Sequence, residues 1–463
     1  MSNSFASMLS QASHAGNADV ISLNKMAIQD NARENYTLRV TNAADTTQII
    51  AQEDIVSDRG VKLVAAGSAI NGSMRDRLLQ HKLNKPLENT IIIGNADVVQ
   101  RLADHAERII SERADLLPLI GWRHSSVTAV DLLAQLRPNR ATLSALALIE
   151  QSEGFGLAPS ALVALIALGI GKQLNLGFKE MTDLTMAAVF HDIGQLYVAP
   201  ELFGFGKKLP PAQWKHIAVH PIVGARIARD TLGLNEAVCR AILESHERID
   251  GSGYPSRTSE VNLSKLGKIL GFAEQISGIA ARPNTGLARL VVAVKVVPYE
   301  HQREVLSGFL RPLSGQISTQ NIPIAPSFND DLHQFFVRIA NTLTVLAHLE
   351  AEPGLDQSFS WVLEKSKQRF DTVQRSFSST GLDMAANNQD WISDLNATLG
   401  GVEAQVALDE MLWRLTELAR DLHLRCDNFN AHQMQLFEPL IAALDGAMTR
   451  SMDVGLNQSA ELF

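Results

Sequence analysis

The sequence predicts a mainly α-helical protein with a small N-terminal module that mixes helix and strand. Apolar residues make up 46% of the chain and aromatic residues only 6%, which favours helices packed through Leu, Ile, Val and Ala. Apolar residues also recur near the helical period of 3.6 in residues 98–110, 161–174 and 332–346. Strand-like segments separated by glycine turns are confined to one short region near the N-terminus. These observations favour an all-helical central domain over an aromatic-rich β-sandwich.

The N-terminal region divides into two parts. Residues 1–45 are polar with few apolar clusters and predict a loose leader, and residues 46–95 predict a small α+β module. Within that module, residues 55–64 alternate around a glycine turn, which is typical of a hairpin. Residues 73–82 predict a short helix capped by Ser73, and Ile91–Ile93 predicts a strand that closes the sheet.

The remainder of the chain is predicted to be helical. Its apolar periodicity and a proline-interrupted linker, Asn-Ile-Pro-Ile-Ala-Pro-Ser, predict five consecutive parts. They are a helical linker over 96–150, a central domain over 151–312, a linker over 313–328, a helical bundle over 329–450 and a tail over 451–463. The bundle has the pattern of a packing or dimerisation element rather than a catalytic one, so we expect a homodimer formed through helices.

Charge and cysteine usage narrow the class of protein. Cys239 and Cys426 are far apart and form no Cys-x-x-Cys pair, which predicts a reducing, cytoplasmic location. Residues 1–16 lack the apolar core of a signal peptide, and the longest apolar run, residues 161–170, is about half the length of a membrane span. The net charge of −9 is concentrated after residue 329, and no basic run is dense enough to predict DNA or RNA binding.

Four short motifs in the central domain carry chemistry. They are His191-Asp192-Ile193-Gly194, His220-Pro221-Ile222-Val223-Gly224-Ala225, the segment His246-Glu247-Arg248-Ile249-Asp250-Gly251-Ser252-Gly253-Tyr254-Pro255, and Ile269-Leu270-Gly271-Phe272-Ala273-Glu274. Their lead residues are separated by 29, 26 and 28 positions, each enough for a pair of helices. A single His is more often a surface or core residue than a ligand, but four motifs in order are not explained by packing.

Imidazole and carboxylate groups together suit iron, manganese, zinc or nickel. Asp192 has two oxygens and can bridge two ions, and two ions about 3.5–4 Å apart can clamp a phosphodiester and activate a water. The motifs therefore predict a metal centre for one or two divalent ions.

Over residues 157–285 the chain resembles HD-GYP domains, the metal-dependent phosphodiesterases of cyclic di-GMP signalling. The resemblance rests on the His-Asp-Ile-Gly, His-Pro-x-x-Gly-Ala and Asp-Gly-x-Gly-Tyr-Pro motifs. It implies an all-helical HD fold, hydrolysis of cyclic di-GMP and a catalytic Asp192. The metal ligands that it implies are His191, Asp192, His220, His246 and Glu274.

The resemblance also implies binding groups outside the metal centre. The loop of Asp250, Gly251, Gly253, Tyr254 and Pro255 corresponds to the family loop that contacts partner signalling domains, including diguanylate cyclases. The cations that are candidates for phosphate contact are Lys207, Lys208, Arg248 and Arg282, of which Arg282 also matches a family turn.

Several positions depart from the family pattern. Pro159 stands where the family has its first metal-binding His, and Gln195 replaces the Lys that follows His-Asp-Ile-Gly. Ser245 replaces the first of two consecutive His residues, Glu274 replaces an Asp, and Ser277 replaces a later Asp. Gln195 donates a hydrogen bond but carries no positive charge, and losing one such group near a transition state commonly lowers the rate by about 10²–10³.

Three hypotheses follow from this pattern. The first is a degenerate HD-GYP protein that binds cyclic di-GMP, a related nucleotide or a signalling partner. The second is an active, divergent metal-dependent phosphodiesterase, since three protein ligands can hold a catalytic ion. The third is a scaffold without metal, in which His191 and Asp192 form a hydrogen-bonded core pair.

Overall fold

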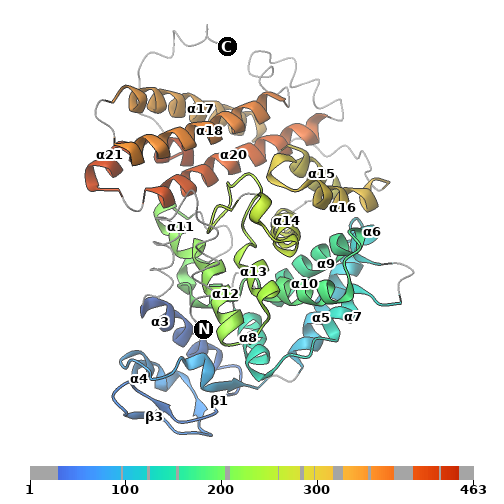
Figure 1. Cartoon of the computed structure of the whole chain (residues 1–463), viewed down its shortest axis with the longest axis vertical. Coiled ribbons are helices and arrows are strands. Elements are labelled where there is room, and N and C mark those ends of the chain that lie inside the picture. The colour runs from blue at the N-terminus through green and yellow to red at the C-terminus, as the bar shows by residue number, and fades with distance from the viewer. Residues whose placement is uncertain are drawn as a thin grey trace. The chain divides into compact units, whose positions relative to one another are not determined.

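A computed structural model gives the structure of the chain (Figure 1). It describes residues 30–94, 97–122, 126–152, 156–203, 209–258, 260–281, 286–296, 298–315, 327–352, 356–379, 400–426 and 429–447. Two compact units are present: Met1–Leu209 with Lys215–Val294 and Pro298–Ser318, and Thr319–Phe463 with two short segments, Pro210–Trp214 and Lys295–Val297. Helices dominate both units, which confirms the predicted mainly-α fold with a small N-terminal sheet. None of the helices in the described ranges is both long and apolar enough to cross a membrane.

The N-terminal module contains two α-helices, five short strands and two 3₁₀ turns in its described residues. Its elements are α3 (Asp30–Ala43), β1 (Ile49–Ala51), β2 (Ile55–Val56), β3 (Lys62–Val64), β4 (Ala69–Ile70), η1 (Gly72–Met74), α4 (Arg75–Leu79), η2 (Leu87–Asn89) and β5 (Ile91–Ile93). The three-stranded sheet has the antiparallel order β4-β1-β5, and β2 pairs with β3 as a hairpin. Gly60 adopts a positive φ of 80° in the hairpin turn, as the glycine pattern predicts. The helix predicted over residues 73–82 is shorter than expected and consists of η1 followed by α4. The side chain of Asn71, not that of Ser73, caps η1.

Helix α3 occupies part of the region for which the sequence predicts a loose leader. Tyr36, Thr37, Val40 and Thr41 are buried, so one stripe of the helix packs against the protein although its overall composition is polar. Residues 1–29 of the predicted leader lie outside the described residues. A single buried stripe is enough to fix a helix whose other faces are solvated.

Between the module and the central helices lies the segment predicted to be a helical linker. It forms α5 (Val98–Glu112), α6 (Leu117–Ile120), α7 (Ala129–Ala134) and α8 (Arg140–Glu150). Helices α5, α6, α7 and α8 all contact α9, so these helices form part of the core of the first unit instead of a separate connector.

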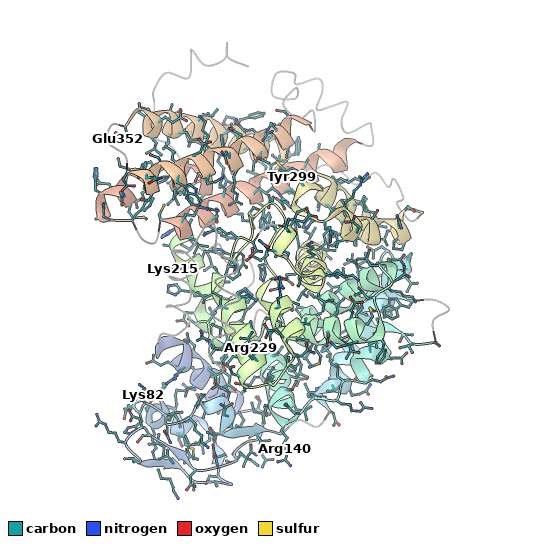
Figure 2. All side chains as sticks on the ribbon, in the orientation of Figure 1. Lys82, Arg140, Lys215, Arg229, Tyr299 and Glu352 are labelled. Atoms are coloured by element: carbon teal, nitrogen blue, oxygen red, sulfur yellow. The ribbon has the colours of Figure 1, made fainter. Side chains whose placement is uncertain are left out.

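The central helices surround α9. They are α9 (Leu157–Gln173), α10 (Phe178–Phe190), α11 (Pro211–Ala218), α12 (His220–Asp230), α13 (Glu236–Leu243), α14 (Lys265–Ala280), α15 (Leu287–Val296) and α16 (Arg303–Leu313), with the short 3₁₀ turns η3 (Ile193–Tyr197), η4 (Pro200–Leu202), η5 (Glu260–Asn262) and η6 (Pro298–Glu300). Residues 163–170 of α9 are all buried, which is expected of a helix that is apolar on every face. Arg229 near the end of α12, labelled in Figure 2, forms an ion pair of 3.3 Å with Glu236 at the start of α13.

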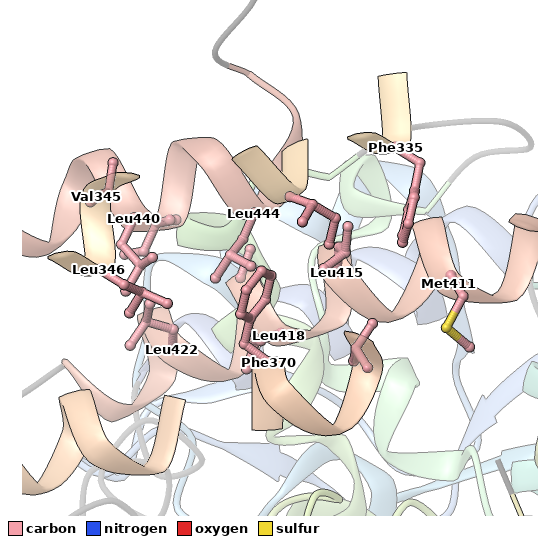
Figure 3. Close-up of a cluster of buried hydrophobic side chains, with 14 of the residues drawn as sticks. Phe335, Val345, Leu346, Phe370, Met411, Leu415, Leu418, Leu422, Leu440 and Leu444 are labelled. Atoms are coloured by element: carbon pink, nitrogen blue, oxygen red, sulfur yellow. The ribbon is translucent and has the colours of Figure 1, made fainter. Parts of the chain in front are cut away.

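The described part of the second unit contains a bundle of four helices. They are α17 (Phe328–Ala351), α18 (Gln357–Ser379), α20 (Gly400–Arg425) and α21 (Ala431–Asp445). Figure 3 shows part of the core, in which Phe335, Phe370, Leu415, Leu418 and Leu444 converge from the four helices. All five side chains are buried, so the apolar periodicity of this region is explained by packing.

Candidate metal centre

His191 and Asp192 stand at the end of α10. His191 is buried, and its Nδ1 lies 2.8 Å from the backbone oxygen of Ala188, one turn earlier in the helix. A hydrogen bond donated from Nδ1 leaves Nε2 as the basic nitrogen. That Nε2 lies 3.0 Å from Oε2 of Glu274 and 3.4 Å from Oδ2 of Asp192.

His220 is the first residue of α12 and repeats this arrangement. Its Nδ1 lies 2.8 Å from the backbone oxygen of Ile217, and its Nε2 lies 3.2 Å from Oδ1 of Asp192. The two oxygens of Asp192 therefore face different histidines, His191 on one side and His220 on the other. The bridging role predicted for this carboxylate fits that arrangement.

His246 follows α13 and completes a three-residue cluster. Donor atoms of Asp192, His220 and His246 all lie within 4.8 Å of one another. Two ligands on opposite sides of an ion at about 2.1 Å would be about 4.2 Å apart, so only small shifts separate this cluster from a coordinating geometry. The ring of His246 stacks on that of Tyr254, with centroids 4.8 Å apart and planes 9° from parallel, and meets His220 edge-on.

Glu274 reaches the centre because α14 approaches the segment after α13 closely. A Cβ atom at Gly267 would lie 2.1 Å from Oε2 of Glu244, and one at Gly271 would lie 3.1 Å from the backbone oxygen of Ser245. These glycines are four residues apart, so they lie on the same face of α14. The close approach places the longer Glu274 side chain against His191 where the family pattern has an Asp.

Burial and neighbouring charges set the ionisation of the centre. Burial alone would lower the pKa of His191, but the carboxylates of Asp192 and Glu274 outweigh it and raise that pKa well above its usual range. Burial would likewise raise the pKa of Asp192, but His191 and His220 hold it well below its usual range. Burial together with neighbouring His220 lowers the pKa of His246 well below its ordinary value, so this imidazole is neutral and keeps a lone pair that a metal ion could accept.

Unsatisfied polar atoms show that this donor set fits a cation. Among the described residues, three buried donor atoms of the centre have no hydrogen-bond partner: Nε2 of His220, Nε2 of His246 and Oδ1 of Asp192. Buried polar atoms are rarely left without a partner, because each one costs about 1–3 kcal/mol. A divalent ion would accept all of these lone pairs, so the residues fit the metal that the sequence predicts.

The Gly-Tyr-Pro loop folds back on His246. Gly251 adopts a positive φ of 74°, and a Cβ atom at Gly253 would lie 2.4 Å from the backbone oxygen of His246. That same oxygen accepts a hydrogen bond of 3.0 Å from the backbone N–H of Tyr254. Gly253 and Pro255 are buried, whereas Asp250 is exposed. Much of the predicted partner loop therefore packs inward and holds the His246 ring.

The sequence pattern did not single out Glu247, which anchors the same loop. Its buried carboxylate accepts hydrogen bonds from the backbone N–H groups of Ser256, at 2.5 Å, and Thr258, at 3.0 Å. Burial raises the pKa of Glu247 to about 7 in spite of these two bonds. Its position beside His246 is the only sequence signal that could have drawn attention to it.

The altered positions offer few replacements for the missing groups. Pro159 is exposed in the first turn of α9, and Ser245 is fully buried with an Oγ that has no hydrogen-bond partner among the described residues. Gln195 is half-buried in η3.

Arg248, a predicted phosphate contact, lies 3.6 Å from the buried carboxylate of Glu300. The other predicted cations, Lys207, Lys208 and Arg282, lie outside the described residues.

His191 and Asp192 thus follow α10, His220 begins α12 and His246 follows α13. Residues 142–296 match the model of the HD domain family. The chain is 26% identical over 150 residues to the cyclic di-GMP phosphodiesterase PA4108 of Pseudomonas aeruginosa, which covers 32% of this chain and 36% of that protein. It is 27% identical over 128 residues to the cyclic di-GMP phosphodiesterase PdeB of Borreliella burgdorferi, covering 28% of this chain and 34% of that protein.

A third relative is named for a different cyclic dinucleotide. The 3'3'-cGAMP-specific phosphodiesterase 1 of Vibrio cholerae is 25% identical over 153 residues, which covers 33% of this chain and 35% of that protein. In each case the matched region spans about a third of the relative's length. Residues 142–296 are thus similar to the HD domain family and, over about a third of each relative's length, to phosphodiesterases named for cyclic dinucleotides.

Proposed function

We propose that this chain binds a cyclic dinucleotide at its HD-GYP-like domain and acts mainly through binding, with reduced or no phosphodiesterase activity. The observation that carries the proposal is the contrast within the centre. Asp192, His220 and His246 form an intact cluster, whereas Pro159 and Ser245 supply no imidazole. The relatives named for cyclic di-GMP and 3'3'-cGAMP hydrolysis support a cyclic dinucleotide as the ligand class.

The proposed cofactor is one divalent ion held by Asp192, His220 and His246. Two imidazoles and one carboxylate favour iron or manganese, with zinc and nickel as alternatives. When bound, such an ion supplies Lewis-acid polarisation of a phosphodiester and lowers the pKa of a bound water. His191 and Glu274 lie beside the cluster and would hold a second ion more weakly, because Pro159 supplies no further imidazole there.

The proposed setting is cytoplasmic signalling. Cys239 and Cys426 are both free and buried, which fits a reducing compartment. A partner such as a diguanylate cyclase domain would contact the exposed part of the loop at Asp250, and the helices of the second unit would mediate homodimerisation. These two roles rest on the family resemblance and on the helical pattern of residues 329–450.

The test uses the purified full-length chain. Metal content is measured by elemental analysis, cyclic di-GMP and 3'3'-cGAMP binding by calorimetry, and hydrolysis by chromatography in the presence of Mn²⁺ or Fe²⁺. We expect metal and nucleotide binding with turnover at least about 10²-fold below that of a family member that retains the Lys at the position of Gln195. Robust turnover that His191→Ala abolishes would favour the active phosphodiesterase instead. Absence of both metal and nucleotide would leave the scaffold hypothesis.

A further inference from the structure

The N-terminal helix α3 contacts the segment that follows the His-Asp pair. Arg39 donates from Nη2 to the backbone oxygens of Gln195, at 3.3 Å, and Val198, at 3.2 Å. Four residues earlier, Asn35 donates from Nδ2 to the backbone oxygen of Tyr197 at 3.1 Å. Side chains of α3 thus donate three hydrogen bonds to backbone oxygens of η3 and of the residue after it. Each bond joins residues that are more than 150 positions apart in the sequence.

An aromatic pair reinforces this contact. The rings of Tyr36 and Tyr197 stack with centroids 4.8 Å apart and planes 16° from parallel. Both side chains are buried, so the pair excludes water from the hydrogen bonds beside it. Asn35, Tyr36 and Arg39 lie on one face of α3, and all three are directed to η3 or its end.

The same 3₁₀ turn is bonded to the metal centre. The backbone N–H of Gln195 donates to the backbone oxygen of Asp192 at 2.8 Å, so the residue that Arg39 holds is one hydrogen bond from a metal ligand. Gly194 packs directly on the start of α12, where a Cβ atom would lie 2.0 Å from the backbone oxygen of His220 and 2.7 Å from the backbone N of Gly224. Displacement of η3 would therefore change the separation of Asp192 and His220.

The chemistry of Arg39 indicates positioning as well as packing. Its side chain is buried, and burying a guanidinium is unfavourable unless its donors find acceptors. One nitrogen, Nη2, serves both carbonyl oxygens, and the planar guanidinium holds its N–H groups in fixed directions, whereas a lysine ammonium sits on a more flexible chain. Burial lowers the pKa of Arg39 to about 10, so it still carries its charge at neutral pH.

We propose that Arg39 of α3 is a positioning residue for the metal centre, which sets the Asp192–His220 geometry by holding the backbone of η3. This role rests on the proposed metal binding by Asp192, His220 and His246. Outer groups that orient metal ligands typically change metal affinity by roughly 10- to 100-fold when they are removed. A residue of the N-terminal module thereby controls the geometry of a centre whose candidate ligands all lie in the central helices and the segments that follow them.

The first experiment measures Co²⁺ affinity and the visible Co²⁺ spectrum of full-length wild-type protein, Arg39→Gln and Arg39→Lys. We expect Arg39→Gln to weaken Co²⁺ binding by on the order of 10-fold and to change the spectrum, with partial recovery in Arg39→Lys. Glu34→Gln is the matched control, because Glu34 is exposed on the same helix. Unchanged affinity and spectrum in a folded Arg39→Gln variant would overturn the proposal, since a purely structural role lowers stability alone.

A second measurement separates this proposal from the proposed function. Hydrogen–deuterium exchange of the metal-free chain should show faster exchange in residues 192–198 and 220–224 of Arg39→Gln than in wild type. If wild type binds no Co²⁺, the proposed metal function fails while this exchange result still decides whether Arg39 holds η3. If Arg39→Gln does not fold, Asn35→Ala removes only the bond to Tyr197, and the same changes are expected at smaller size. Equal exchange in wild type and variant overturns the positioning role.

Discussion

Asp192 is the residue on which the candidate centre depends. Its Oδ1 faces His220 at 3.2 Å and its Oδ2 faces His191 at 3.4 Å, so a single carboxylate joins the two halves of the centre. The carboxylates of Asp192 and Glu274 raise the pKa of His191, so this imidazole holds a proton more readily than an ordinary histidine does. Metal binding at His191 would release that proton. At His246 no proton need be released, because its lowered pKa leaves the imidazole neutral.

The first prediction concerns Asp192→Asn. Asparagine removes the negative charge that attracts an ion, so Mn²⁺ should no longer raise the melting temperature. For wild type, an ion at about 100 times its dissociation constant adds about 2.7 kcal/mol, on the order of 5 °C for a unit of this size. Asp230→Asn, an exposed change on α12, should leave the wild-type shift intact. Thermal scans with Mn²⁺ and with chelator make the comparison, and an undiminished shift in Asp192→Asn would place the ion elsewhere.

The second prediction concerns the pH dependence contributed by Glu247. Its pKa in the folded protein is about 7 against an ordinary value of 4.5, so the folded state retains the proton to higher pH than the unfolded chain. The stability that this group contributes is full below about pH 4.5 and is lost as the pH rises through about 7. The difference corresponds to roughly 3 kcal/mol.

Glu247→Gln should flatten this fall, because glutamine cannot ionise. Its baseline stability should be somewhat lower, because a single amide oxygen replaces two carboxylate oxygens that accept from Ser256 and Thr258. Melting temperatures between pH 5 and 8 in chelator measure the effect, with Glu260→Gln as the exposed control. A slope in Glu247→Gln equal to that of wild type would contradict the assignment.

At the residue scale, the sequence predicts the candidate metal-binding groups but not the residues that hold them in place. His191, Asp192, His220 and His246 were predicted because imidazole and carboxylate groups recur in motifs at helical separations. Arg39 was not predicted because its partners are backbone oxygens more than 150 residues away, which leave no trace in side-chain pattern. Glu247 was missed because its function depends on burial under a loop that closes only in the folded chain.

At the element scale, close contacts between backbones fix the centre. The third prediction is that Gly194→Ala lowers stability by about 3 kcal/mol or more and weakens metal binding, because its Cβ would overlap the backbone of His220. The matched control is Gly278→Ala on α14, where a Cβ meets no atom within 4 Å. That change should stabilise the protein by about 0.5–1 kcal/mol through helix propensity. Calorimetric unfolding with metal titration tests both, and a stable, metal-binding Gly194→Ala would show that η3 and α12 can separate freely.

Local sequence signals account for the elements that were predicted. The β2–β3 hairpin depends on neighbouring residues and on the positive φ of Gly60, so its signal lies within about ten positions. Helix α3 gave a weak signal because only one stripe around Tyr36 and Val40 is buried. The role of α5 to α8 as packed core helices likewise depends on contact with α9, which a sequence period cannot distinguish from a helical linker.

At the scale of the whole molecule, the candidate metal ligands and the core of the bundle belong to different units. All five candidate ligands lie in the first unit, whereas Leu415 is buried in the bundle of the second. The fourth prediction is that Leu415→Ala lowers the stability of the bundle by about 2–5 kcal/mol, because a fully buried leucine leaves a cavity. Metal affinity per folded molecule should stay at the wild-type value.

Leu343→Ala is the control for this prediction, because Leu343 lies in the same bundle with 38% of its surface exposed. Its effect on stability should be about 1 kcal/mol or less, since little apolar area is lost from the core. Scanning calorimetry gives the stability of each variant, and Co²⁺ titration gives the affinity. A folded Leu415→Ala variant with weakened Co²⁺ binding would mean that the bundle controls the centre. The acidic helices would then act on the metal site and not only on assembly.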